Sequence, residues 1–277
     1  MNPDHYCQER CAASGSSFYY SFLFLPAERR RAIMALYAFC REVDDVVDEC
    51  QDVALASTKL AWWRQEIGRV ADGQPQHPVG LALQAASARF HLPAEQLLEI
   101  IDGMEMDLQQ TRYLDFKGLS LYCYRVASVV GLLAAEIFGA RDRQTQKYAH
   151  DLGMAFQLTN IIRDIGEDAR RGRIYIPIDE LKQFDVPAAD ILNGRYSDNF
   201  TALMRFQTER AEKYYAQAIA QLPAVDRRSQ RPGLIMAAIY RTLLDEIRHE
   251  NFQVLHQRIA LTPVRKLWIA WKTWALA

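Results

Sequence analysis

Three oxygen-bearing side chains recur at four-residue spacing in the middle of the chain. Asn160, Asp164 and Asp168 lie at positions i, i+4 and i+8 of one stretch. On a helix, side chains four residues apart are neighbours, so one amide and two carboxylates form a single stripe. Stacked carboxylates repel each other, whereas a hard cation with oxygen ligands, such as Mg²⁺, removes that repulsion. The stripe therefore indicates a magnesium site, and the alternative is a solvated acidic face.

A second acidic stripe falls within residues 28–50. At about 100° per helical residue, Tyr37, Arg41, Asp44 and Asp48 share one face, and Asp45 lies off it. Apolar residues occupy the rest of this helix, which is more typical of a cavity wall than of a solvated surface. Two such helices facing each other across a bundle would form one metal-rich pocket.

Two further segments have groups that suit phosphate oxygens. Arg170, Arg171 and Arg173 follow the central stripe, where Pro177 indicates that the helix has ended. The segment from Ser14 to Ser17 could present hydroxyl and backbone donors to a phosphate. It could equally cap a helix, and both roles are compatible.

Composition and spacing predict an all-α protein. The 277 residues include only 13 Gly and 10 Pro, and apolar residues recur at helical spacing without a series of alternating strands. Lys and Arg total 33 and Asp and Glu total 34, for a net charge of -1. This balance argues against a nucleic-acid partner held by bulk electrostatics.

Cysteine usage and the N-terminus predict a cytoplasmic protein. The five cysteines are odd in number and form neither a CxxC motif nor a zinc-type set with His, so reduced thiols are the simplest account. No basic segment leading into an apolar one begins the chain. The longest apolar stretch, residues 126–140, is interrupted by Glu136 and is too short to span a bilayer.

The patterns predict a succession of helices joined by short breaks. Residues 51–58 and much of 178–200 read as loops and turns. In the helix at 94–110, Asp102 and Asp107 do not share a face and are interpreted as supporting or solvated. Small residues in the helix at 118–139 would leave room for an apolar ligand or for close packing. The predicted helices are 28–50, 59–71, 79–91, 94–110, 118–139, a central helix through 157–168, 201–221 and 233–258.

The C-terminal segment, residues 260–277, reads as a basic and aromatic amphipathic piece. Trp268, Trp271 and Trp274 recur at a spacing of three, beside Arg265, Lys266 and Lys272. Such a piece could rest peripherally on a membrane interface, which here would be the inner membrane face, or its tryptophans could pack onto the body of the protein. Both readings remain open.

Several common site motifs are absent from the sequence. There is no GxGxxG and no GxxxxGK[ST], so neither a Rossmann site nor a P-loop is indicated. HExxH does not occur, and the single ExxH at 246–249 falls short of the two that a di-iron bundle needs.

The chain resembles the squalene/phytoene synthase family of head-to-head prenyltransferases over nearly its whole length. The resemblance rests on Ser-Gly-Ser-Ser-Phe at 14–18, Tyr37-xxx-Arg41-xx-Asp44-xxx-Asp48, and Gln157-Leu-xx-Asn160-xx-Arg163-Asp164-xxx-Asp168. Tyr122-Cys-Tyr-xx-Ala127-xxx-Gly131 and Tyr240 add to it. Individual sequence segments, such as Phe-Tyr-Tyr-Ser-Phe-Leu-Phe-Leu-Pro at 18–26, are similar to the bacterial presqualene diphosphate synthases of hopanoid pathways.

The resemblance implies a single domain, 1–277, folded as an isoprenoid-synthase helical bundle with a central cavity between the two aspartate-rich helices. It implies several Mg²⁺ ions held by Asp44, Asp48, Asn160, Asp164 and Asp168. It implies catalytic residues at Tyr37, Arg41, Tyr122, Arg163 and Tyr240. Substrate-binding residues would be Ser14, Gly15, Ser16, Ser17, Phe18, Tyr37, Arg41, Gln157, Arg163, Tyr240 and Arg258.

The activity implied by the resemblance is condensation of two farnesyl diphosphates to presqualene diphosphate, with release of diphosphate and without NADPH. Phytoene from geranylgeranyl diphosphate, or continuation to squalene or hydroxysqualene, are alternatives within the family. The proton-abstracting base would be Tyr122 or the released diphosphate. Downstream enzymes of squalene synthesis are candidate partners. A non-catalytic helical assembly factor of the same family is the alternative from another class, and intact acidic stripes argue against it.

Overall fold

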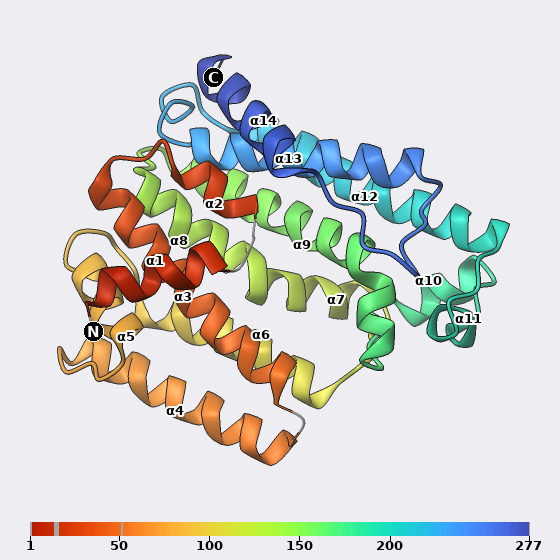
Figure 1. The fold of residues 1–277 in the computed structure, drawn as a ribbon, viewed down its shortest axis with the longest axis horizontal. Helices are drawn as coiled ribbons and strands as arrows, with labels where there is room; N and C mark the ends of the chain where they lie inside the picture. Colours follow the sequence, from red (N-terminus) through yellow and green to blue (C-terminus); the bar gives the residue numbers. More distant parts are fainter. Residues whose placement is uncertain (1, 14–16, 51, 277) are drawn as a thin grey trace.

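The chain folds into one all-α domain, as the sequence predicts, in which helices surround the long helix α9 (Figure 1). This computed structural model describes residues 2–13, 17–50 and 52–276. The helices of the first half are α1 (Pro3–Ala13), α2 (Ser17–Phe22), α3 (Ala27–Glu49), α4 (Val53–Ala71), α5 (Pro78–Ser87), α6 (Ala94–Gln109) and α7 (Phe116–Cys123). Those of the second half are α8 (Val129–Phe138), α9 (Gln144–Arg170), α10 (Ile178–Gln183), α11 (Ala188–Leu192), α12 (Asp198–Gln221), α13 (Arg231–His249) and α14 (Pro263–Leu276).

Helix α9 is central because it packs against α8, α12 and α13 at once. Ile161, Ile162 and Ile165 are buried on its apolar sides. Gly153 permits close approach of a neighbouring helix, since a Cβ at this position would lie 2.6 Å from the carbonyl oxygen of Ala127. The acidic stripe of α9 is thereby held at a fixed distance from the helices opposite.

Helices α7 and α8 form one continuous rod through a π-helical turn at Tyr124–Ser128, in place of the regular helix predicted at 118–139. The Val129 N–H donates to the Tyr124 carbonyl, five residues back. By length and composition alone, Phe116–Phe138 could span a membrane, contrary to the sequence expectation. The rod packs against α3, α6 and α9, so it serves as a core helix of the bundle.

Two helix boundaries differ from the sequence expectation for local reasons. Helix α4 begins at Val53 rather than in the late fifties, because the Asp52 carboxylate caps it by accepting the N–H groups of Ala54 and Leu55. Helix α13 ends at His249, because Asn251 and Phe252 adopt left-handed backbone angles. Arg258 therefore lies in the connection to α14 and not on the helix predicted at 233–258.

The buried side chains form two clusters on opposite sides of the bundle. One cluster lies around α3 to α6, and the other around α9, α12 and α13. Phe18 and Val126 are partly buried and pack against both clusters. The site described below lies where the two clusters meet.

Candidate active site

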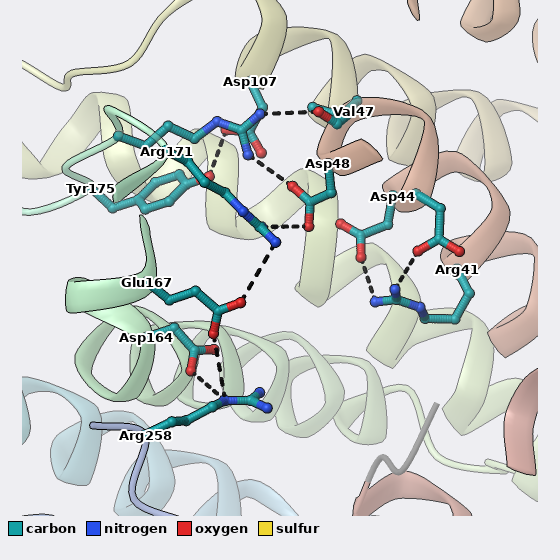
Figure 2. Close-up of polar contacts among 12 residues, drawn as sticks. Arg41, Asp44, Val47, Asp48, Asp107, Asp164, Glu167, Arg171, Tyr175 and Arg258 are labelled. Atoms are coloured by element: carbon teal, nitrogen blue, oxygen red, sulfur yellow. Dashed lines mark hydrogen bonds and ion pairs between the residues drawn. The ribbon is translucent and has the colours of Figure 1, made fainter. Parts of the chain in front are cut away.

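A polar pocket opens between α3 and α9. Asp44 and Asp48 line it from α3, and Asp164 and Asp168 line it from α9. Figure 2 shows carboxylates from these two helices directed into the same space. The structure thus brings the two stripes together, as the sequence spacing predicts.

Arginine side chains separate the two rows of carboxylates. Asp48 is held from across the pocket by Arg173 and Arg171, each at an N···O distance of 2.9 Å (Figure 2). Arg173 also donates to the Val47 carbonyl at 3.3 Å. These two arginines follow α9, so they tie the end of that helix to α3.

Asp44 and Asp164 are also paired with arginines. Arg41 donates to Asp44 at 2.6 Å and also pairs with Asp45. Asp164 pairs with its neighbour Arg163 and accepts from Arg258 Nε at 2.9 Å. Among residues 2–13, 17–50 and 52–276, no three His, Cys, Asp or Glu side chains converge as the ligands of one ion would.

Burial shifts the pKa values of carboxyl groups in the acidic pocket. Burial raises the pKa of Asp168 to about 8, reinforced by the charges of Asp164, Asp107 and Asp48. Burial likewise raises the pKa of Asp44 to about 7, although Arg41 opposes the shift. Burial would also raise the pKa of Asp164, but hydrogen bonds and charge from Arg163 and Arg258 hold it below its usual range. The pocket is therefore suited to accept additional positive charge.

Asn160 gives a second reason to expect a bound cation in the polar pocket. Its Nδ2 donates to Gln157 Oε1 at 3.2 Å. Its Oδ1 is buried without a hydrogen-bond partner among the described residues. A buried unpaired carbonyl oxygen is costly, and a bound cation would satisfy it. The oxygen-rich donor set and this oxygen fit Mg²⁺.

Asp107 of α6 is a site residue that sequence reasoning missed. It is buried in the same pocket rather than solvated, and it accepts hydrogen bonds from the phenols of Tyr122 and Tyr175, each at 2.9 Å. Burial raises the pKa of Asp107 to about 6, and burial also raises the pKa of Tyr122 well above 10. The signal in the sequence was an acid on an apolar stripe, because Asp107 shares the buried face of Ile100 and Met104.

An apolar cavity adjoins the polar pocket. Cys40, Val126, Gln157 and Asn160 line both spaces. Small residues of the α7–α8 rod form one wall of the cavity, and a Cβ at Gly131 would lie 2.6 Å from the Ala149 carbonyl oxygen, so the structure shows both alternatives, room beside the helix and close packing. These wall residues are Ala127, Gly131, Ala134 and Ala135.

Aromatic rings gather where the apolar cavity meets the polar side. Phe18 lies with its ring centroid 6.0 Å from that of Tyr37, 5.9 Å from that of Phe156 and 6.1 Å from that of Tyr240. Phe18 lines the apolar cavity and also a smaller polar pocket beside it. The family resemblance implies that Phe18, Tyr37 and Tyr240 belong to the substrate site, and the structure brings them together.

The smaller polar pocket is rich in cationic side chains. Arg41, Arg163, Arg258 and Lys266 line it, together with Tyr240. Lys266 was not among the predicted site residues, because it comes from α14, which the sequence alone could not place against the site. Ser14, Gly15 and Ser16 lie outside the described residues, and Ser17 is described only as the first residue of α2.

Comparison with known proteins accounts for this combination of pockets. A family model described as squalene/phytoene synthase matches residues 11–265. The chain belongs to the squalene/phytoene synthase family. Members are prenyltransferases that act on isoprenyl diphosphates and use a divalent metal, typically Mg²⁺.

Relatives within the family have different names. A phytoene synthase of Arthrospira platensis is 36% identical over 274 residues, covering 94% of this chain and 89% of the relative. A dehydrosqualene synthase solved with a ligand is 26% identical with a TM-score of 0.88, covering 99% of this chain and 96% of that one. Squalene synthase HpnC of Alicyclobacillus acidocaldarius is 27% identical with a TM-score of 0.79, covering 90% of this chain and 94% of that one.

Proposed function

We propose that this family member condenses two farnesyl diphosphates head to head to presqualene diphosphate, with release of one diphosphate, in squalene and hopanoid biosynthesis. The observation that carries the proposal is the junction of an acidic and cationic pocket with an apolar cavity through shared wall residues. A diphosphate head and a prenyl tail need these two environments side by side. No nicotinamide takes part, because closing the cyclopropane loses a proton and transfers no hydride.

Binding of the two diphosphates is assigned to the guanidinium groups on both sides of the acidic rows. Arg171 and Arg173 hold Asp48 on one side, and Arg163, Arg258 and Lys266 line the pocket on the other. Guanidinium forks match phosphate oxygens, so these side chains can exchange a carboxylate partner for a phosphate one. Tyr37, Arg41, Gln157 and Tyr240 would complete the walls around the head groups.

Asp44, Asp48, Asn160, Asp164 and Asp168 would hold Mg²⁺, directly or through water. When bound, Mg²⁺ neutralises charge that develops on a leaving diphosphate. The unpaired Oδ1 of Asn160 and the raised pKa values of Asp44 and Asp168 support this assignment.

Ionisation of the first substrate leaves an allylic cation that the cavity must keep from water. Phe18, Phe22 and Phe156 line that cavity, and their ring faces can stabilise positive charge. The double bond of the second substrate then attacks this carbon, and loss of a proton closes the three-membered ring.

The proton acceptor that we favour is Tyr122 acting with Asp107. Because the pKa of Tyr122 is raised, its phenol stays protonated and cannot act alone as a phenolate base. Tyr122 can take the substrate proton at Oη while passing its own proton to Asp107 Oδ2, which lies 2.9 Å away. The released diphosphate is the competing base.

A second candidate function is condensation of two geranylgeranyl diphosphates to phytoene. The relatives that carry the name phytoene synthase, at 36% identity, favour it. Purified protein should be incubated with Mg²⁺ and either substrate, without nicotinamide, and the lipids identified by mass spectrometry. Presqualene diphosphate from farnesyl diphosphate supports the first proposal. Phytoene from geranylgeranyl diphosphate, with no product from farnesyl diphosphate, supports the second candidate function instead. No product from either diphosphate supports a non-catalytic role.

The two acidic rows can be tested separately with conservative variants. Asp48→Asn and Asp164→Asn should each abolish Mg²⁺-dependent turnover with the fold intact. Glu49→Gln is the matched control, because Glu49 is the exposed neighbour of Asp48 at the end of α3 and does not line the site. Full turnover in either aspartate variant would refute the assignment of both rows to the metal.

A further inference from the structure

Helix α14 turns its apolar side toward solvent, which is the reverse of an ordinary surface helix. Trp268 and Trp271 are 59% and 52% exposed, and Val264 is 76% exposed. Only Ala270 is fully buried among the described residues of this helix. Figure 1 shows α14 on the outside of the bundle, next to α13.

The exposed apolar surface extends beyond α14 to the turn after α2. Phe24 in this turn stacks on Trp274 with ring centroids 5.5 Å apart. Trp268 and Trp271 stack on each other at 5.2 Å. Together with Leu23, these side chains form what we call the aromatic patch, made of Leu23, Phe24, Val264, Leu267, Trp268, Trp271 and Trp274.

Positive charge at the aromatic patch comes from Lys272 and Arg231. The residues Pro263–Leu276 include no acidic residue, and Lys272 is exposed among them, whereas Arg265 pairs with Glu246 and Lys266 lines the smaller polar pocket. The guanidinium of Arg231 lies 5.6 Å from the centroid of the Trp274 ring. Tryptophan and basic residues on one helix are characteristic of a segment that lies in the headgroup layer of a membrane. Charge complementarity therefore points to an anionic lipid surface.

One end of the apolar cavity lies next to the aromatic patch. Phe22 at the end of α2 and Pro232 and Gly233 at the start of α13 line that cavity. The same two elements contact the patch, since α2 packs against both α13 and α14. Isoprenyl chains are poorly soluble in water, so a lipid surface at this end suits their transfer.

We propose that the aromatic patch docks this protein peripherally on the surface of an anionic lipid bilayer. The tryptophan rings enter the headgroup layer, and Lys272 lies over the lipid phosphates. The cavity end at Phe22 and Gly233 then faces the membrane, and the acidic pocket lies at the opposite end of the cavity.

The test is co-sedimentation of the full chain with lipid vesicles. One set of vesicles contains phosphatidylcholine alone, and the other an equimolar mixture with phosphatidylglycerol. The native protein should bind the anionic vesicles more tightly. The Trp268→Ser/Trp271→Ser variant should weaken binding to both by about tenfold or more. Lys272→Gln should weaken binding to anionic vesicles by about fivefold and leave binding to neutral vesicles unchanged.

Matched controls separate docking from general loss of apolar surface. Leu55→Ser/Leu114→Ser removes two exposed apolar side chains on other faces and should leave vesicle binding unchanged. Circular dichroism and turnover in the absence of vesicles should be unaltered in the tryptophan variant, since its side chains line none of the pockets of the site.

Two results would overturn the proposal. One is native protein that stays in the supernatant with both kinds of vesicle. The other is a native dimer by light scattering that Trp268→Ser/Trp271→Ser converts to a monomer, which would assign the aromatic patch to contact with a second copy of the chain.

Discussion

Asp107 gives the sharpest test of the proposed proton transfer. The Asp107→Asn variant keeps the size of the side chain and replaces one carboxylate oxygen by an NH₂ group, which cannot accept a hydrogen bond. In the native protein both oxygens accept, one from Tyr122 and one from Tyr175, each at 2.9 Å. One of the two phenols therefore loses its acceptor, and the acceptor for the transferred proton is neutralised.

The expected loss follows from these two effects. A hydrogen bond to a buried charged group contributes about 1.5–3 kcal/mol, or about 10- to 100-fold in rate if it operates only in the transition state. Loss of general-base assistance costs about 10²- to 10⁴-fold. We expect kcat to fall by about 10²- to 10⁴-fold with little change in KM, because Asp107 lies behind the phenols and not among the arginines that bind diphosphate.

The assay is initial diphosphate release at saturating farnesyl diphosphate and Mg²⁺, with products confirmed by mass spectrometry. The native rate should fall on the acid side as Asp107 is protonated, with a midpoint at or below about pH 6 because bound cations lower its pKa. Asp107→Asn should lack this acid limb. Asp102→Asn, on the same helix and paired with Arg64, is the control and should retain native turnover. Native turnover in a folded Asp107→Asn protein would refute the relay and leave the released diphosphate as the base.

Three further predictions concern stability and are read from unfolding in urea or on heating. Asp168→Asn should stabilise the metal-free protein, because the folded pKa of Asp168, about 8, exceeds its unfolded value. The gain in the free energy of unfolding should be absent below about pH 4, grow as pH rises to about 8, and then stay constant. No gain at pH 8 would contradict the raised pKa of Asp168. Asp226→Asn should cost about 1.5–3 kcal/mol at pH 7, because this buried carboxylate accepts from two backbone N–H groups and from Thr145. The pKa of Asp226 is lowered in the folded protein, so the difference in the free energy of unfolding between native and variant should persist above the unfolded pKa and vanish as pH falls through the folded pKa. A constant difference at all pH values would argue against a charge effect. Gly153→Ala should destabilise by about 1–3 kcal/mol because its Cβ would lie 2.6 Å from Ala127 O, whereas the control Gly68→Ala meets nothing within 4 Å and should stabilise by about 0.5–1 kcal/mol.

Local patterns were sufficient to predict most of the fold. The bounds of the helices at 28–50, 94–110 and 201–221 were predicted to within a few residues, because apolar residues recur at helical spacing within them and chain-breaking residues follow or precede them. The start of α4 was missed because the capping role of Asp52 was not recognised. The end of α13 was missed because no Gly or Pro marks it in the sequence. The chain leaves the helix there through the left-handed backbone of Asn251 and Phe252.

The site was predictable where its residues share one helix and less so where they meet across the bundle. Asp44, Asp48, Asp164 and Asp168 could be found from spacing alone. The apolar neighbours of Asp107 indicate only that it is buried, and Lys266 has no local signal, because the importance of both residues depends on which helices α6 and α14 pack against. The cross-pocket pairing of Asp48 with Arg171 and Arg173 also depends on tertiary contact and has no local signature.

The π-helical turn at Tyr124–Ser128 gives the chain an unusual tolerance of a change in length inside a helix. Such a turn holds one residue more than the α-helix that would replace it. Deleting a single residue there should let the rod become a regular helix, still apolar and still able to pack. Because the turn absorbs the extra residue, Tyr122 and α8 would keep their present facing, and the hydrogen bond from Tyr122 to Asp107 would remain. Here one deletion inside a helix would leave a folded protein with that contact intact, whereas loops are where most proteins tolerate changes in length.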